Sequence, residues 1–146
     1  MKKKVFSFLA ALLLISTISV FVFADEYIYD DNHQNSPYNY ARITGPNNNK
    51  TGTVYIKSSY VDNGYRCYRG AIRYRYYNKL TGSFSWSPYS YTAYGTGPSD
   101  SSTHTASLSV STTLLNTNVY TIYYDALFFW TPANSTYWPV SHEEIS

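Results

Sequence analysis

The sequence predicts an all-β fold, a single antiparallel β-sandwich of about seven strands. Three observations predict it. Apolar side chains recur at every second position over several stretches, these stretches are separated by Gly, Asn and Pro residues typical of turns, and no stretch after residue 24 keeps a helical period. A sheet that is apolar on one face has to bury that face, and packing a second sheet against it is a common solution.

Two segments alternate most clearly. In residues 103–111 the even positions form an apolar face and the odd positions are Thr or Ser. In residues 118–128 the even positions again form the apolar face, while Tyr123 and Asp125 point the other way. Both segments are therefore expected to be strands with one face in the core.

The longest strand is expected over residues 65–78. The even positions that should face the core are Tyr68, Ile72, Tyr74 and Tyr76. Its odd positions include Arg69, Arg73 and Arg75, which should lie together on the opposite face. A less regular strand is expected over residues 53–61, with one side formed by Val54, Ile56 and Tyr60.

A hairpin turn should follow the longest strand, because residues 78–82 combine polar turn residues with a glycine that can adopt positive φ. Phe84 and Trp86 are expected to continue the even-numbered apolar face, and the plausible registers pair Tyr76 with either of them. Pro88 cannot donate a backbone hydrogen bond, so it predicts an edge strand or a bulge.

Residues 1–24 have the pattern of a cleaved secretory signal peptide. Three lysines precede an uncharged apolar stretch, and Val22 and Ala24 suit the two cleavage-site positions that signal peptidase recognises. The alternative is an uncleaved anchor, since about 20 apolar residues can span a bilayer, but Ser and Thr residues dilute the stretch and Asp25 follows it at once. We therefore expect a secreted or cell-surface protein, typical of bacteria, with no transmembrane segment after processing.

The expected domain plan divides the processed chain into three parts. Residues 25–37 are acidic and aperiodic and should form a flexible leader, residues 38–140 should form the sandwich, and residues 141–146 should form a tail. Removing the signal also removes three of the eleven Lys and Arg residues. The remaining eight face nine carboxylates, which gives a net charge of −1, so we expect no nucleic-acid partner.

Cys67 is the single cysteine of the chain and cannot form an internal disulfide. It is either buried as a small apolar residue or paired with another chain. The domain must therefore be held together by its core, and the oligomeric state is left open.

The segment from Leu114 to Tyr120 resembles the corner of fibronectin type III and related immunoglobulin-like sandwich domains. Those domains leave one strand through a leucine and a polar turn, and a tyrosine six residues later opens the next strand. By this resemblance Tyr120 would be the corner tyrosine, with its hydroxyl bonded back to nearby backbone. The chain differs from the family in lacking a clear early-strand tryptophan and in its high tyrosine content. The resemblance implies a sandwich architecture and no particular function.

No catalytic motif occurs in the sequence. Serine hydrolases need a histidine that is positioned by an acid beside a nucleophile, whereas His104 is the only histidine in an expected strand and should bond to backbone. Residues 30–33 offer oxygen donors of the kind that calcium prefers, but a flexible acidic segment explains them equally. We therefore expect no enzymatic activity, no cofactor and no metal.

Two features indicate binding. All 18 tyrosines follow residue 24, too many for one small core, and exposed aromatic rings suit sugars and protein interfaces. No acidic residue occurs in residues 63–99, so the arginine stripe could contact an anionic polymer. The candidate ligand-binding residues are Arg69, Arg73, Arg75, Tyr89, Tyr91 and Trp138.

Each feature also has a purely structural interpretation. Tyrosine has a high strand propensity, and arginines on a strand can cover a neighbour and deter edge pairing. Residues 127–130 are apolar on both faces, so this strand end should be buried on both sides or meet a partner. The sequence favours a small secreted, non-catalytic module that binds an envelope or host polymer, a glycan or a protein. The alternatives are a membrane-active toxin or bacteriocin-like effector and, third, a secreted hydrolase.

Overall fold

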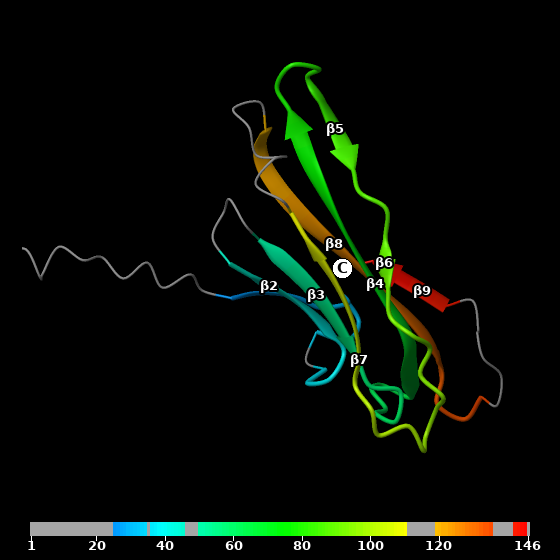
Figure 1. The fold of residues 1–146 in the computed structure, drawn as a ribbon. Helices are drawn as coiled ribbons and strands as arrows, with labels where there is room; N and C mark the ends of the chain where they lie inside the picture. Colours follow the sequence, from blue (N-terminus) through cyan, green and yellow to red (C-terminus); the bar gives the residue numbers. More distant parts are fainter. Residues whose placement is uncertain (1–24, 35, 46–49, 111–118, 136–141, 146) are drawn as a thin grey trace, which may run out of the picture.

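The computed structural model describes residues 25–34, 36–45, 50–110, 119–135 and 142–145, with only the backbone described for 119–121 and 142–145. This part of the chain forms nine strands in two antiparallel sheets and contains no helix (Figure 1). No helix in the described ranges is therefore long and apolar enough to cross a membrane. The predicted all-β class is confirmed.

The two sheets face each other, and the hairpin of β4 and β5 extends past the end of the other sheet (Figure 1). The first, which we name the β3 sheet, has the strand order β1-β2-β3-β7. Its strands are β1 (Glu26–Ile28), β2 (Tyr40–Thr44), β3 (Thr51–Ile56) and β7 (His104–Ser109). The second, the β4 sheet, has the order β5-β4-β8-β9, and β6 also pairs with β4. Its strands are β4 (Tyr65–Asn78), β5 (Ser83–Trp86), β6 (Ser90–Tyr91), β8 (Val119–Pro132) and β9 (His142–Ile145).

The core lies between the sheets and follows the predicted alternation. In β7, Ala106 is buried between the exposed residues Thr105 and Ser107, and in β8 Ala126 and Phe128 are fully buried. The buried cluster at the centre comprises Ala41, Val54, Ile56, Cys67, Ile72, Ala106, Ala126, Phe128 and Trp130. The apolar faces predicted for the strands around residues 103–111 and 118–128 are confirmed where their side chains are described.

Gly52 and Tyr124 hold the two sheets at close spacing. A Cβ atom on Gly52 would lie 2.5 Å from the Tyr124 ring and 2.7 Å from Ile72, so no larger residue fits there without a shift. The Tyr124 hydroxyl reaches the β3 sheet, where it donates to the backbone oxygen of Lys50 at 2.8 Å. Burial raises the pKa of Tyr124 to about 12, so the hydroxyl keeps its proton at neutral pH.

A β-bulge in β4 changes the face on which Tyr68 lies. Cys67 and Arg69 pair with consecutive residues of β8, so Tyr68 is the extra residue. Cys67 joins the core as a buried free thiol, and burial raises its pKa. The Tyr68 ring is buried outside the core cluster, 6.1 Å from Tyr94 and 6.2 Å from Phe129. The prediction that Tyr68 faces the core is wrong, whereas the predicted burial of Cys67 is confirmed.

The hairpin turn between β4 and β5 forms where it was predicted. Gly82 has φ 65° and its amide donates to the Asn78 oxygen at 2.9 Å. Asn78 pairs with Ser83, so four residues separate the paired ends. This loop length pairs each even position of β5 with an odd position of β4, and the predicted parity is therefore wrong.

Phe84 and Trp86 consequently leave the core. They pair with Tyr77 and Arg75, whereas Tyr76 pairs with a serine instead of either aromatic residue. Both aromatic side chains are exposed. They lie on the outer face of the β4 sheet, beside the arginines of β4.

Two segments expected to lie outside the sandwich are part of it. β1, in the predicted leader, pairs with β2, and Asp30 and His33 beyond it are buried. The His33 ring stacks on Trp130 with centroids 3.8 Å apart, and its Nδ1 lies 3.1 Å from Asp62. β9, in the predicted tail, pairs with the end of β8. Both strands are short, and the buried residues beyond β1 are isolated in the sequence. Neither segment therefore shows the alternation of apolar and polar residues by which strands are predicted.

The remaining strand predictions hold in part. β3 ends at Ile56, and Tyr60 follows in a turn in which its amide donates to the Lys57 oxygen at 3.1 Å. Pro88 lies between β5 and β6 at the edge of the β4 sheet, as predicted. Leu127, Phe128 and Trp130 are buried, which confirms that this strand end is covered on both faces.

The corner that resembles immunoglobulin-like domains lies mostly outside the described residues. Residues 114–118 are not described, and Tyr120 is placed only by its backbone, as the second residue of β8. The role of Tyr120 stays a prediction.

Candidate ligand-binding face

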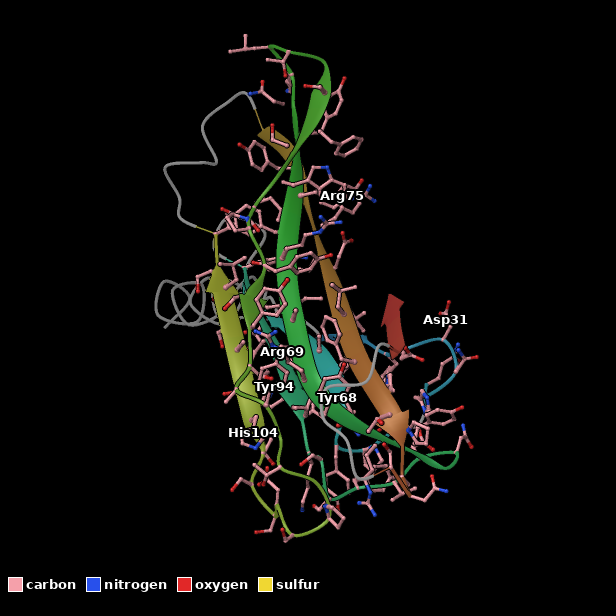
Figure 2. The ribbon with its side chains drawn as sticks, turned by 90° about the vertical axis from the view of Figure 1, so that its right-hand side faces the viewer. Asp31, Tyr68, Arg69, Arg75, Tyr94 and His104 are labelled. Carbon is pink, nitrogen blue, oxygen red and sulfur yellow. The ribbon has the colours of Figure 1, made fainter. Side chains whose placement is uncertain are left out.

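The outer face of the β4 sheet carries three arginines interleaved with aromatic rings. Figure 2 shows Arg75 toward the hairpin end of β4 and Arg69 further along the strand, beside Tyr94. The rings come from β5, β6, the segments next to them and β8. We name this set the arginine–aromatic ladder, and it comprises Arg69, Arg73, Arg75, Phe84, Trp86, Tyr89, Tyr91, Tyr94 and Tyr123.

Arg73 and Arg75 both contact Trp86. The guanidinium carbon of Arg73 lies 3.8 Å from the Trp86 ring and 4.6 Å from the Tyr89 ring. The guanidinium carbon of Arg75 lies 5.3 Å from Trp86 and 4.8 Å from the Tyr123 ring. Each of these guanidinium groups is therefore held against at least two rings.

Arg69 is held in the same way further along β4. Its guanidinium carbon lies 4.1 Å from the Tyr91 ring and 4.4 Å from the Tyr94 ring. Its Nη1 donates to the Tyr94 hydroxyl at 2.8 Å. The β-bulge contributes here, because it places the Tyr68 ring behind Tyr94 in a stacked arrangement.

The ladder has more positive than negative charge. Asp125 of β8 pairs with Arg73, with Oδ2 3.3 Å from Nε. Among the residues whose side chains are described, no carboxylate lies within ion-pair distance of Arg69 or Arg75. Within that set, three guanidinium groups are opposed by one carboxylate.

Stacking on rings orients a guanidinium group while its in-plane N–H groups stay able to donate. The Nε atoms of Arg69 and Arg75 are covered, and no described residue accepts a hydrogen bond from them. The Nε of Arg73 is engaged by Asp125. Contact with an incoming anion would therefore come from the Nη groups.

The structure brings together most of the predicted ligand-binding residues. Those found in the ladder are Arg69, Arg73, Arg75, Tyr89 and Tyr91. Trp138 lies outside the described residues. Phe84 and Trp86 were missed, although they are 47% and 45% exposed, because they were assigned to the core. The length of the hairpin turn was the signal that could have placed them.

Comparisons with protein-family models, with curated proteins and with solved structures found no significant match. The functional interpretation of this chain rests on its own geometry.

The outer face of the β3 sheet is also aromatic, and Lys57 at the end of this sheet lies over the Tyr38 ring, with Nζ 4.7 Å from the centroid. Its rings contact one another, with the Tyr40 and Tyr55 centroids 4.9 Å apart and those of Tyr27 and Tyr40 5.7 Å apart. Burial and then the neighbouring Tyr55 raise the pKa of Tyr40. Arg42 on this face pairs with Asp25, so its charge is balanced.

Hydroxyl groups cover the outer face of the β3 sheet across β3 and β7. Thr51 pairs with Ser109 and Thr53 with Ser107, each with 2.8 Å between the hydroxyl oxygens. These hydroxyl groups therefore satisfy one another across the two strands.

His104 bonds to a carboxylate and not to backbone, which corrects the prediction. Its Nε2 lies 2.7 Å from Asp100 Oδ2, and the same carboxylate accepts from the Thr96 and Ser102 amides. His104 first and then these amides hold the pKa of Asp100 below its usual range. The Ser58 hydroxyl donates to Asp100 at 3.3 Å and not to His104, so the histidine is not placed to activate this serine. Asp100 serves here to organise the loop that precedes β7.

The acidic segment considered for calcium is engaged within the fold. Asp30 is buried and accepts from the Asn32 amide at 2.9 Å, while His33 contacts Asp62. No group of three or more His, Cys, Asp or Glu residues suited to a metal occurs in the described part of the chain.

Proposed function

We propose that this chain is an exported, non-catalytic binding module whose arginine–aromatic ladder contacts an envelope or host polymer, or a protein. One observation carries the proposal: three guanidinium groups are oriented by rings on an open sheet face and opposed by one described carboxylate. Guanidinium groups in fixed orientation are suited to recognising oxyanions.

The exposure of the ladder favours binding over a purely structural role. If the rings served only to cover neighbouring strands, their own faces would be buried. The rings between 43% and 47% exposed are Phe84, Trp86, Tyr91, Tyr94 and Tyr123. A contiguous exposed aromatic surface is characteristic of interaction sites.

The fold is proposed to be immunoglobulin-like, closest in its strand order to fibronectin type III domains. Naming β2, β3, β4, β5, β7, β8 and β9 as strands A, B, C, C′, E, F and G gives sheets A-B-E and C′-C-F-G. Tyr120 is the second residue of β8, where the corner tyrosine opens strand F. β1 is an additional strand beside β2. This assignment supports an architecture and no particular ligand.

Export is proposed from residues 1–24, together with a bacterial source and a secreted or cell-surface location. The charged start, the apolar stretch and the small cleavage-site residues support it.

A pull-down of the processed chain on isolated bacterial envelopes tests the proposed function. We expect retention at low salt and release as salt rises, because neutralising anionic groups displaces counterions. A triple variant, Arg69→Gln with Arg73→Gln and Arg75→Gln, should lose at least about tenfold of the retention. Arg42→Gln makes the same chemical change on the β3 sheet, where the arginine is paired with Asp25, and should retain wild-type binding. Equal retention by the triple variant would refute the proposal.

A further inference from the structure

We propose that the ladder binds a linear phosphodiester polymer with non-aromatic spacers, whose phosphates repeat at about 7 Å along β4. This inference rests on the proposed function and names the class of its ligand. Three observations carry it: the spacing of the arginines, the donors that remain on them, and the covered faces of the rings.

The distances between the arginines along the strand are multiples of one interval. β4 is regular from Arg69 to Tyr76, because its bulges lie outside this stretch. At about 3.3 Å per residue, Arg73 and Arg75 are separated by about 7 Å, and Arg69 and Arg73 by about 13 Å. The arginines therefore lie one interval of about 7 Å apart in one case and two such intervals apart in the other.

A phosphodiester chain with three-carbon spacers has the same interval. Such a chain has six backbone bonds from one phosphorus to the next. At roughly 1.2 Å of advance per bond, as in an extended polypeptide, the phosphates repeat at about 7 Å. Four consecutive phosphates then span the distance from Arg69 to Arg75, about 20 Å.

The remaining donors suit phosphate. Each phosphodiester has two non-bridging oxygens, and a planar guanidinium edge can donate to both. With the Nε atoms covered or engaged, the Nη groups are left to present such an edge. At Arg69 one of them, Nη1, also donates to the Tyr94 hydroxyl. The rings fix the arginine side chains in advance, so less conformational entropy is lost on binding.

The covered rings favour a polymer without bases. Single-stranded nucleic acid has a similar phosphate interval, but its binding depends on free aromatic faces on which the bases stack. Every ring in the ladder has a guanidinium carbon within 3.8–5.3 Å of its centroid, so at least one face of each ring is occupied. We therefore assign the rings to positioning the arginines, and the comparison with oligothymidylate below tests whether their other faces also stack bases.

The test measures the affinity of the processed chain for 1,3-linked glycerol phosphate oligomers of one to eight phosphates. We expect the affinity to rise up to four phosphates and then to increase only slightly. Replacing all three ladder arginines by lysine keeps the charge and removes the planar edge, and should weaken binding of the four-phosphate oligomer at least tenfold. Arg42→Lys is the matched control and should bind like the wild type. Circular dichroism of each variant checks that the fold is kept.

Three results would overturn the inference. These are equal binding by the triple lysine variant, no dependence on oligomer length up to four phosphates, and tighter binding of oligothymidylate than of glycerol phosphate with the same number of charges. The last result would identify a nucleic-acid site. If envelopes retain the wild type but not the triple glutamine variant, while glycerol phosphate oligomers do not bind, the proposed function stands and this ligand class is wrong.

Discussion

Both outer faces of the sandwich are rich in tyrosine and both carry arginine, but the arginines have different neighbours. On the β3 sheet, Arg42 pairs with Asp25 and the tyrosine rings contact one another. On the β4 sheet, Arg69 and Arg75 contact rings, and no described carboxylate pairs with them. The same residue type is thus paired with a carboxylate on one face, and on the other it contacts rings with no described carboxylate partner at two of three positions.

The difference shows why composition alone does not locate a binding face. A carboxylate beside an arginine balances its charge, whereas a ring orients the guanidinium group and leaves the charge in place. Net charge hides the contrast, because the chain after residue 24 carries eight Lys and Arg residues and nine carboxylates. The placement of carboxylates relative to the two sheets decides which face can attract an anion.

The largest predicted effect is on the free energy of unfolding and its pH dependence, and it concerns Asp100, which lies outside the ladder. The folded-state pKa of Asp100 is below its unfolded value of about 3.9, so its contribution to stability is complete above that value and is lost as pH falls further. Asp100→Asn should cost about 2 kcal/mol at pH 7, the size expected for hydrogen bonds to a charged group. Urea unfolding from pH 7 to pH 2 should show the two stability curves converging on the acid side.

Asp100 is not part of the ladder, so its substitution should leave the ladder contacts in place. At neutral pH, Asp100→Asn should bind the polyanion, here the four-phosphate glycerol phosphate oligomer, as well as the wild type does. Parallel stability curves for the two proteins at acid pH would contradict the assigned role of Asp100.

The second effect concerns aromatic residues of matched exposure on the two faces. Trp86 is 45% exposed and contacts two guanidinium groups, while Tyr27 is 49% exposed on the β3 sheet. Trp86→Ala should weaken polyanion binding about tenfold, since a cation–π contact contributes about 1 kcal/mol. Tyr27→Ala should change it less than twofold, and titration by fluorescence anisotropy measures both. Equal losses in the two variants would remove the distinction between the faces.

The smallest effect sharpens the electrostatic part of the comparison. Asp125 competes with an anionic ligand for Arg73, so Asp125→Asn should strengthen polyanion binding about threefold, in line with the modest energy of a partly exposed ion pair. Asp25→Asn removes the corresponding carboxylate on the β3 sheet and should leave binding unchanged. Weaker binding by Asp125→Asn would mean that Asp125 positions Arg73 and does not compete with the ligand.

Much of the fold could be predicted from local pattern. The bounds of β4, the alternation in β7 and β8, the hairpin turn at Gly82 and the burial of Cys67 all follow from periodicity and residue type. β1 and β9 could not be predicted, because short strands at the edges of sheets carry too few residues to show a period.

The candidate site was predicted only in part. Arg69, Arg73 and Arg75 occupy odd positions of one strand. Their location on one face could be predicted, since alternate side chains of a strand lie on opposite faces. The aromatic partners of these arginines lie on other segments. Their positions depend on how those segments pair with β4, which residue types do not specify.

The sequence by itself determined that this chain is built from strands and that its three ladder arginines share a face, because side-chain alternation is a local property of an extended backbone. Only the tertiary structure decided that Phe84 and Trp86 join those arginines and that Tyr68 lies outside the core. The reason is register. A turn of four residues and a single bulged residue each shift the pairing by one position, and a shift of one position moves every affected side chain to the other face of the sheet.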